Sequence, residues 1–530
     1  MSLEYNLVHR INMGDILKRS AKRFPNKFAL VEGERRITYE ELNKMVNKVA
    51  QGFQAIGLVK GDRLAILSSN SIEFVLTYFA CAKAGITIVP INTGLLPNEI
   101  EYILQDSHSK AVVVECQFLE HIQSSRDMIT LKDVIVIGGL SDLNESNNNQ
   151  RFHEWNSIWR NQDGTEVLCH VDDRDLMQCL YTSGTTSNPK GVMSSHTAVY
   201  FNTLGTAFDL KFSDQDVSIA MMPLYHVAQL NAITTPVFLA GGTTIIMKKF
   251  EPETLMALIE KEKATQIFGL PMMYRALLEH PKRIEYDLSS LRLCVYAMAP
   301  MPDYELKRAH DVFKCDFALL FGQTEMAPVA TVFRPEHQLV KPGAAGTPAV
   351  NVEVAVMDEK GNILPEKEIG EIVYRSPQTM EGYLNDKEKT DEAFAHGWFH
   401  SGDYGYFDDD QILWFVDRKK DMVKTGGVNV SSIEVEKVIF QHQNVQNVAV
   451  VGLPHERWTE ALTAFVISKD NVEISEEEIV NLCKRQLGGF KVPKKVVIVK
   501  EFPMTSSGKI QKHILRNNHI DLYENEKLIK

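Results

Sequence analysis

The sequence has few of the features that mark secreted or membrane proteins. Its seven cysteines form no C-x-x-C pair and are odd in number, so we expect reduced thiols and a cytoplasmic protein. Residues 1–15 lack the apolar core of a signal peptide. The most apolar segment, residues 74–91, is interrupted by Lys83 and Gly85, which predicts a buried helix and then a strand, with no transmembrane segment. Peripheral contact with a membrane, to collect a lipid, stays open.

Excess positive charge and several catalytic motifs are also missing. The formal net charge is −12, which provides no electrostatic reason to expect nucleic acid as a partner. The chain contains no zinc-ligand spacing, no G-x-S-x-G nucleophile elbow and no G-x-G-x-x-G dinucleotide fingerprint. Zinc hydrolases, serine hydrolases of the elbow type and dinucleotide oxidoreductases therefore have no support.

What the sequence does contain is a regular alternation of strand-like and helix-like segments up to about residue 321. This alternation predicts an α/β fold with a largely parallel sheet. From residue 352, short strands with glycine turns indicate a small β-rich subdomain, and a fresh α+β pattern follows a charge run at residues 417–421. Such a run is most often a solvated face. We expect a large N-terminal domain, residues 1–417, a small mobile α+β domain, residues 418–530, and a hinge near Lys420.

The stretch Y-T-S-G-T-T-S-N-P-K-G, residues 181–191, is the most informative local feature. Hydroxyls, backbone N–H groups and one lysine on a turn suit a polyanion. The stretch is not the phosphate loop G-x-x-x-x-G-K-[ST], because Pro189 replaces its second glycine and Gly191 follows the lysine. The candidate phosphate-binding residues are Thr182, Ser183, Gly184, Thr185, Thr186 and Lys190.

Five other short segments carry candidate functional residues: P-L-Y-H at 223–226, F-G-Q-T-E at 321–325, G-W-F-H-S-G-D at 397–403, D-R-K-K-D at 417–421 and P-M-T-S-S-G-K at 503–509. Each has an ordinary interpretation when taken alone. Glu325 and Lys509 could be solvated surface charges, Asp403 a turn former, and His226 a satisfied core histidine. Their joint order and spacing predict one common site.

Together these segments resemble the adenylate-forming superfamily, which includes acyl- and aryl-CoA synthetases, firefly luciferase and peptide-synthetase adenylation domains. The resemblance covers essentially the whole chain and points to the fatty-acyl-CoA synthetase, or acid–CoA ligase, branch. It implies that a carboxylic acid reacts with ATP to give acyl-AMP and pyrophosphate. The acyl group then passes to coenzyme A, which yields acyl-CoA and AMP.

For the first step, the resemblance implies a role for each matching residue. The 182–190 loop would grip the leaving phosphates, Glu325 would hold Mg²⁺, Thr324 would bond the α-phosphate, and Lys509 would bridge carboxylate and α-phosphate. His226 joins this catalytic group. The remaining nucleotide-binding residues would be Ala299, Pro300 and Phe321 at adenine, Gly322 and Gln323 beside them, and Asp403 and Arg418 at the ribose.

For the second step, the resemblance implies that the small domain turns about Lys420. The face near Gly426 and Gly427 would then approach the pantetheine arm, where glycines permit close backbone approach. Lys424 and Asn429 would help hold the nucleotide at this stage.

Several positions depart from the family pattern. Ala297 and Met298 replace two glycines of the usual G-G-A-P string, which puts the dimensions of the acid pocket in question. The other departures are Ser187 for glycine, Phe321 for tyrosine, Ser401 for threonine and Thr459 for glycine.

The candidate acid pocket is apolar and has no fixed charge, which suits an uncharged tail. Its residues are Tyr225, His226, Val227, Leu230, Phe268, Leu270, Pro271, Met298 and Met326. Arg275 is the nearest candidate for a second carboxylate, and we do not expect it to face the site. A medium- or long-chain fatty acid is favoured.

Four alternatives stay open: an aryl-acid–CoA ligase of the coumarate or benzoate type, an acyl-AMP ligase that loads a carrier protein, a luciferase-like oxidase, and a non-catalytic nucleotide-binding relative. A monomer or homodimer is expected.

Overall fold

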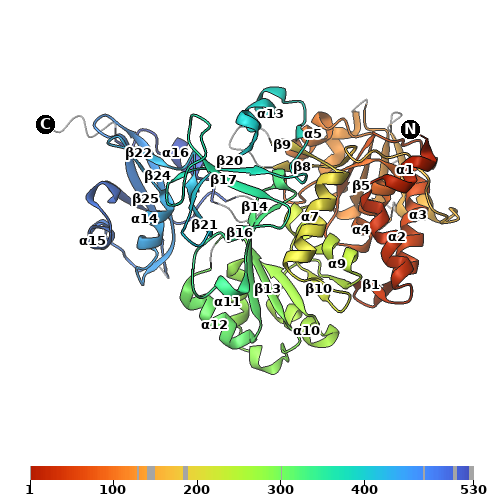
Figure 1. Ribbon diagram of the computed structural model, residues 1–530, viewed down its shortest axis with the longest axis horizontal. Helices are drawn as coiled ribbons and strands as arrows, with labels where there is room; N and C mark the ends of the chain where they lie inside the picture. Colours follow the sequence, from red (N-terminus) through yellow and green to blue (C-terminus); the bar gives the residue numbers. More distant parts are fainter. Residues whose placement is uncertain are drawn as a thin grey trace. The chain divides into compact units, whose positions relative to one another are not determined.

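The computed structural model describes residues 2–127, 130–139, 150–182, 189–299, 301–469, 472–504 and 510–523. The chain forms two compact units (Figure 1). The first comprises Met1–Val354 and Tyr374–Phe399, and the second Ala355–Val373 and His400–Lys530. Each is described by itself. The functional boundary expected at residue 417 remains a prediction.

The first unit contains two predominantly parallel sheets with helices between and around their strands, which is the expected α/β architecture. One sheet has the order β16-β15-β14-β13-β12-β10-β11-β1-β2. Its strands are β1 Phe28–Glu32, β2 Arg35–Thr38, β10 Val217–Ala220, β11 Thr243–Ile246, β12 Gln266–Gly269, β13 Leu293–Ala297, β14 Asp316–Gly322, β15 Val329–Phe333 and β16 Thr347–Pro348.

The other sheet has the order β19-β9-β8-β4-β3-β5-β6-β7. Its strands are β3 Arg63–Leu67, β4 Thr87–Pro90, β5 Ala111–Glu115, β6 Asp133–Ile137, β7 Arg151–Glu154, β8 Leu176–Thr182, β9 Lys190–Ser195 and β19 Gly382–Tyr383. The helices of the unit are α1 Leu3–His9, α2 Met13–Arg23, α3 Tyr39–Ala55, α4 Ile72–Ala84, α5 Pro97–Asp106, α6 Trp155–Trp159, α7 His196–Asp209, α8 Val227–Gln229, α9 Thr235–Ala240, α10 Pro252–Glu262, α11 Pro271–Glu279, α12 Asp303–Phe313 and α13 Lys387–Ala393.

Two local predictions are confirmed. The sequence T-Y-E-E at residues 38–41 predicts a capping box at a helix start, and α3 has it: the Thr38 N–H donates to Glu41 Oε2 at 2.9 Å and the Glu41 N–H donates to Thr38 Oγ1 at 3.3 Å. Residues 74–91 form the buried helix α4 and the strand β4. Within the described ranges, no helix is long and apolar enough to cross a bilayer.

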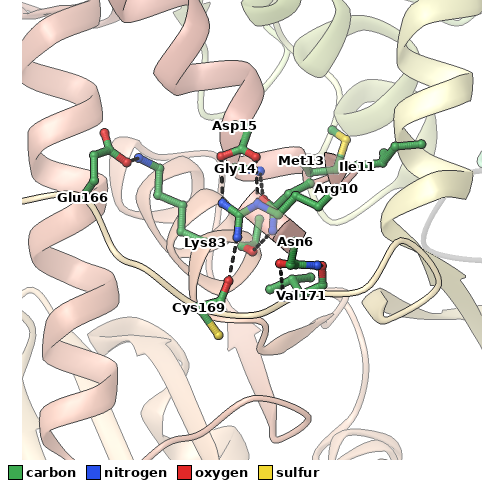
Figure 2. Close-up of polar contacts among 12 residues, drawn as sticks. Asn6, Arg10, Ile11, Met13, Gly14, Asp15, Lys83, Glu166, Cys169 and Val171 are labelled. Carbon is green, nitrogen blue, oxygen red and sulfur yellow. Dashed lines mark hydrogen bonds and ion pairs between the residues drawn. The ribbon is translucent and has the colours of Figure 1, made fainter. Parts of the chain in front are cut away.

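The N-terminal segment is tied to the first unit by polar contacts that sequence reasoning did not find (Figure 2). The Asn6 side chain donates to the Val171 carbonyl at 2.8 Å and accepts from the Val171 N–H at 3.1 Å. The Arg10 guanidinium donates two hydrogen bonds to the Asp15 carboxylate and a third to the Cys169 carbonyl. Nearby, the buried Lys83 ammonium pairs with Glu166 at 3.0 Å. A buried charge is costly unless it is paired. These contacts therefore hold residues 6–10 against residues 169–171, and Lys83 against Glu166.

The second unit is built from two sheets, and in one of them β26 pairs with β25 in parallel. A four-stranded sheet has the order β17-β18-β20-β21. The boundaries between the two units fall inside β17, β18 and β20. A five-stranded sheet has the order β23-β22-β25-β24, with β26 on β25. The elements are β17 Glu353–Met357, β18 Gly370–Arg375, β20 Phe399–Phe407, β21 Leu413–Arg418, β22 Val423–Thr425, β23 Val428–Val430, β24 Val445–His455, β25 Thr459–Ser468, β26 Lys495–Ile498, α14 Ser432–Ile439, α15 Glu476–Gln486 and α16 Lys512–Asn518.

Candidate active site

Four neighbouring strands bring most of the candidate segments of the first unit together. The strands β10, β12, β13 and β14 are adjacent and pair in parallel. Residues that follow the carboxyl ends of such strands lie along one edge of the sheet, where open α/β sheets bind ligands. The segments at this edge are residues 222–226 after β10, 270–271 after β12, 298–299 after β13 and 323–326 after β14.

A tight turn positions Thr324 and Glu325. The Gln323 N–H donates to the Pro328 carbonyl at 3.0 Å, which folds β14 back into β15. A Cβ at Gly322 would lie 2.0 Å from that carbonyl oxygen, so only glycine fits there. The Glu325 carbonyl accepts from the Met380 N–H at 2.8 Å. The half-buried Glu325 side chain is thereby held at the carboxyl edge.

Tyr383 links Glu325 to Lys190, and sequence reasoning missed it. Its hydroxyl donates to Glu325 Oε1 at 2.9 Å, and the Lys190 Nζ lies 4.6 Å from the centre of its ring. Burial, together with the Glu325 charge, raises the pKa of Tyr383 well above its ordinary value. The sequence signal was only an aromatic residue after a glycine, a pattern that core aromatics share.

The phosphate-type loop connects two antiparallel strands. Thr182 ends β8 and pairs with Lys190, which begins β9. The strand β9 was not predicted from the sequence; the helix α7 follows it and begins at His196. Six loop residues, Ser183, Gly184, Thr185, Thr186, Ser187 and Asn188, lie outside the described residues, as do Pro300 and Lys509.

Met298 adopts a backbone conformation that favours glycine. Its φ is 71°, and the residue is 39% exposed at the end of β13, beside the exposed Ala299. A non-glycine residue in this left-handed region costs about 1 kcal/mol. The substitution therefore adds a long side chain at the carboxyl edge.

The other candidate pocket residues are mostly buried and apolar. Val227, Leu230, Phe268 and Met326 are buried, and the others apart from Met298 are half-buried: Tyr225, His226, Leu270 and Pro271. The candidate adenine residue Phe321 is also half-buried. His226 directly precedes α8. Its N–H donates to the Pro223 carbonyl at 3.1 Å, and the centre of its ring lies 5.4 Å from that of the Tyr225 ring. Arg275 is engaged elsewhere, because its Nε donates to Glu305 at 2.7 Å.

In the second unit, Asp403 and Arg418 face each other. They are paired residues of β20 and β21, with 3.9 Å between Arg418 Nε and Asp403 Oδ1. Ser401 retains a hydroxyl at the position where the family pattern has threonine. Its Oγ accepts from the Asp403 N–H at 3.0 Å and donates to the Ile372 carbonyl at 2.6 Å. Position 418 is exposed, so the guanidinium is accessible to a ligand.

The charge run at 417–421 is only partly a solvated face. Arg418, Lys419 and Lys420 are exposed, but Asp417 is 1% exposed. Its Oδ2 accepts from the Ser432 N–H at 2.6 Å and from the Ser432 hydroxyl at 2.7 Å, at the start of α14. The common reading of a charge run as a solvated face does not hold at Asp417, whose carboxylate satisfies the N–H groups of a helix start, nor at Asp421, which is also buried.

The two candidate pantetheine glycines form a hairpin turn. Gly426 and Gly427 have φ of 58° and 82° and connect β22 to β23. A two-residue turn of this type requires positive φ at both positions, so the turn itself explains the glycines. Lys424 and Asn429 are paired and exposed on either side.

Two models of AMP-binding enzymes match most of the chain. A family model described as AMP-binding enzyme matches residues 17–384, and one described as AMP-binding enzyme C-terminal domain matches residues 434–509. The chain belongs to the AMP-binding enzyme family. It is an AMP-forming acid–CoA ligase of the adenylate-forming superfamily, as the motifs indicated.

Relatives of this AMP-binding enzyme differ in their acids. A feruloyl-CoA synthase of Amycolatopsis sp is 33% identical, over 94% of this chain and 97% of that protein. The long-chain-fatty-acid–CoA ligase FadD13 of Mycobacterium tuberculosis is 34% identical, over 96% and 98%. An ATP-bound MatB structure from Rhodopseudomonas palustris has a TM-score of 0.87 and 29% identity, over 97% of this chain and 100% of that one.

Proposed function

We propose that this acid–CoA ligase activates a medium- or long-chain fatty acid, with Mg²⁺ and coenzyme A. The observation that carries this proposal is the apolar candidate pocket: Val227, Leu230, Phe268 and Met326 offer no charge, and the guanidinium of Arg275 is already bound to Glu305. An uncharged tail is therefore favoured over a second carboxylate.

In the first half-reaction, a carboxylate oxygen attacks the α-phosphorus of ATP, and the bond to pyrophosphate breaks. Two anions must meet, so catalysis consists mainly of positioning and charge neutralisation. We assign phosphate contacts to Thr182, Lys190 and Thr324, and ribose contacts to Asp403 and Arg418. We assign to Lys509 the positive charge that bridges the carboxylate and the α-phosphate as negative charge develops in the transition state.

Glu325 fits a Mg²⁺ ion that arrives with ATP. Its carboxylate accepts a hydrogen bond from the Tyr383 hydroxyl, and carboxylate oxygens are ligands that hard cations prefer. In the described part of the chain no three His, Cys, Asp or Glu side chains gather as a metal site. This suits a metal bound by one carboxylate plus substrate phosphates. Bound there, Mg²⁺ would neutralise phosphate charge.

In the second half-reaction, the sulfur of coenzyme A attacks the acyl carbonyl carbon, and AMP leaves with the electron pair. We propose that residues 418–530 turn about Lys420 between the two steps, as a hinge at the end of a strand allows. Lys509 then leaves the reacting centre, and the turn at Gly426 and Gly427 approaches the thiol arm.

An aryl acid is the second candidate substrate. The specific observations are the feruloyl-CoA synthase relative and an indoleacetate–CoA ligase of Aromatoleum aromaticum, 29% identical over 96% of this chain and 98% of that protein. The apolar pocket suits a ring as well as a chain.

A substrate panel tests the proposal. The protein is incubated with ATP, Mg²⁺ and acids from acetate to palmitate, benzoate and coumarate, with and without coenzyme A, and pyrophosphate and AMP are measured. We expect the highest turnover with medium or long fatty acids and coenzyme A. Preference for coumarate would establish the aryl alternative, and turnover without thioester formation would reject the ligase.

The Lys509→Ala variant tests whether Lys509 serves adenylation alone or thioester formation as well. We expect loss of adenylation with retained thioester formation from supplied acyl-AMP. Equal loss of both steps would contradict a lysine that serves only the first step.

A further inference from the structure

Tyr383 occupies the space between two oppositely charged candidate residues. The Lys190 ammonium lies over the face of its ring, within the distance at which cation–π attraction operates, and its hydroxyl donates to Glu325. In the described part of the structure, Lys190 and Glu325 form no ion pair with each other. A lysine and a glutamate that serve one anionic substrate would otherwise be drawn together.

The backbone around Tyr383 is clamped to the strand that carries Lys190. β19 pairs with β9, with Tyr383 opposite Val192, and the Leu384 N–H donates to the Gly191 carbonyl at 2.8 Å. The Tyr383 N–H donates to Thr390 Oγ1 at 2.9 Å. These bonds fix the backbone that carries the ring independently of either charge, so the side chain can act as a spacer.

The other nearby acid does not compete for Lys190. Asp386 feels the charge of Lys190, but its carboxylate is bound by Lys389 at 2.5 Å. The aromatic face is therefore the contact that holds the Lys190 ammonium.

We propose that Tyr383 is a positioning residue that keeps Lys190 and Glu325 apart, so that the first stays available to phosphates and the second to Mg²⁺. The proposal rests on the proposed function, in which both residues serve Mg²⁺ and ATP. The ring and the hydroxyl have separable tasks: the ring holds the lysine and the hydroxyl orients the carboxylate.

Two substitutions separate these tasks. Tyr383→Phe keeps the ring and removes the hydrogen bond, and Tyr383→Leu removes both. ATP binding is measured by calorimetry in EDTA and across a Mg²⁺ titration, with no acid present. For Tyr383→Phe we expect unchanged affinity in EDTA and about a tenfold higher half-saturating Mg²⁺ concentration, the ratio that one hydrogen bond to a charged group provides. For Tyr383→Leu we expect, in addition, that the affinity for ATP in EDTA falls roughly fivefold, because Lys190 then pairs with Glu325.

A double variant supplies the decisive comparison. In Tyr383→Leu with Glu325→Gln, the lysine has no carboxylate to pair with, so affinity for ATP in EDTA should return toward that of the wild type. Tyr286→Phe is the matched control, because it removes a similar hydrogen bond, from the Tyr286 hydroxyl to Glu253 at 3.1 Å, on different elements. It should change neither measurement.

The outcomes distinguish this proposal from the function itself. Wild-type Mg²⁺ dependence in Tyr383→Phe, or no recovery in the double variant, would overturn the spacer role while leaving the ligase intact. A wild-type protein that does not bind ATP would instead reject the proposed function.

Discussion

The candidate residues of the first unit come from segments far apart in the sequence, both loops after parallel strands and the antiparallel strands β9 and β19. Those described in the second unit lie on antiparallel hairpins. Glu325, Tyr383 and Lys190 come from three distant segments and meet through a hydrogen bond and a ring contact. Asp403 and Arg418 face each other across two strands joined by a short turn. The first arrangement depends on long-range packing, and the second mainly on local strand pairing. Substitutions should therefore be coupled in the first unit and more nearly independent in the second.

The largest expected contrast concerns catalysis. Glu325→Gln should lower adenylation by roughly 100-fold or more, because it removes charge where the phosphates react. Asp403→Asn should weaken nucleotide binding by about tenfold, the loss of one charge-assisted hydrogen bond. Pyrophosphate release and ATP affinity measure the two effects. Equal losses in both variants would remove the distinction between the units.

Stability should respond most strongly at a buried carboxylate of the second unit. Asp417→Ala leaves the Ser432 N–H and hydroxyl without their acceptor, so the free energy of unfolding should fall by about 3 kcal/mol. Asp409→Ala is the control, because its pair with Lys367 is exposed and should contribute less than about 0.5 kcal/mol. Denaturant titration followed by hydrogen exchange in α14 checks both values. Equal effects would contradict a structural role for Asp417.

Acidification should affect the two units at different pH. Burial lowers the pKa of His196, in the first unit, from 6.5 to about 4. Below pH 6.5 the unfolded chain takes up a proton that the folded chain does not, so stability falls between pH 6.5 and 4. The loss reaches about 3 kcal/mol at most.

Glu371, in the second unit, behaves differently. Burial alone would raise its pKa, but Lys419 and His400 outweigh burial and lower it. Its contribution is complete above the ordinary pKa of 4.5 and is lost only as the pH falls through the lowered value. Hydrogen exchange resolved by segment should show the first unit weakening first, and His196→Gln should reduce this early loss. An unchanged pH profile in that variant would assign the effect to other groups.

The smallest effects concern two residues in glycine-like conformations. Met298→Gly in the first unit and Thr459→Gly in the second, where φ is 67°, should each raise the free energy of unfolding by up to about 1 kcal/mol. Only Met298→Gly should also shift the preferred acid toward longer chains. Thermal unfolding and the acid panel measure these two effects. No gain for longer acids would mean that the pocket is bounded elsewhere.

Local chemistry was predictable wherever neighbouring residues decide the outcome. The capping box at Thr38 and Glu41 depends on residues close in sequence. β9 was missed because Lys190–Ser195 is a strand only through its pairing with β8, which the sequence alone does not indicate. The acceptor role of Asp417 was missed because it depends on Ser432, which lies beyond β22 and β23.

The sequence by itself determined the α/β class and the family and supplied candidate residues for the expected chemistry, because each motif is a short run with its own local geometry. Tertiary structure decided which of those residues meet. Only the parallel order of β14, β13, β12 and β10 brings their loops to one edge, and only the pairing of β19 with β9 places Tyr383 against Lys190. The physical reason is that strand pairing acts between segments hundreds of residues apart, where the pattern of a single segment carries no information about its partner.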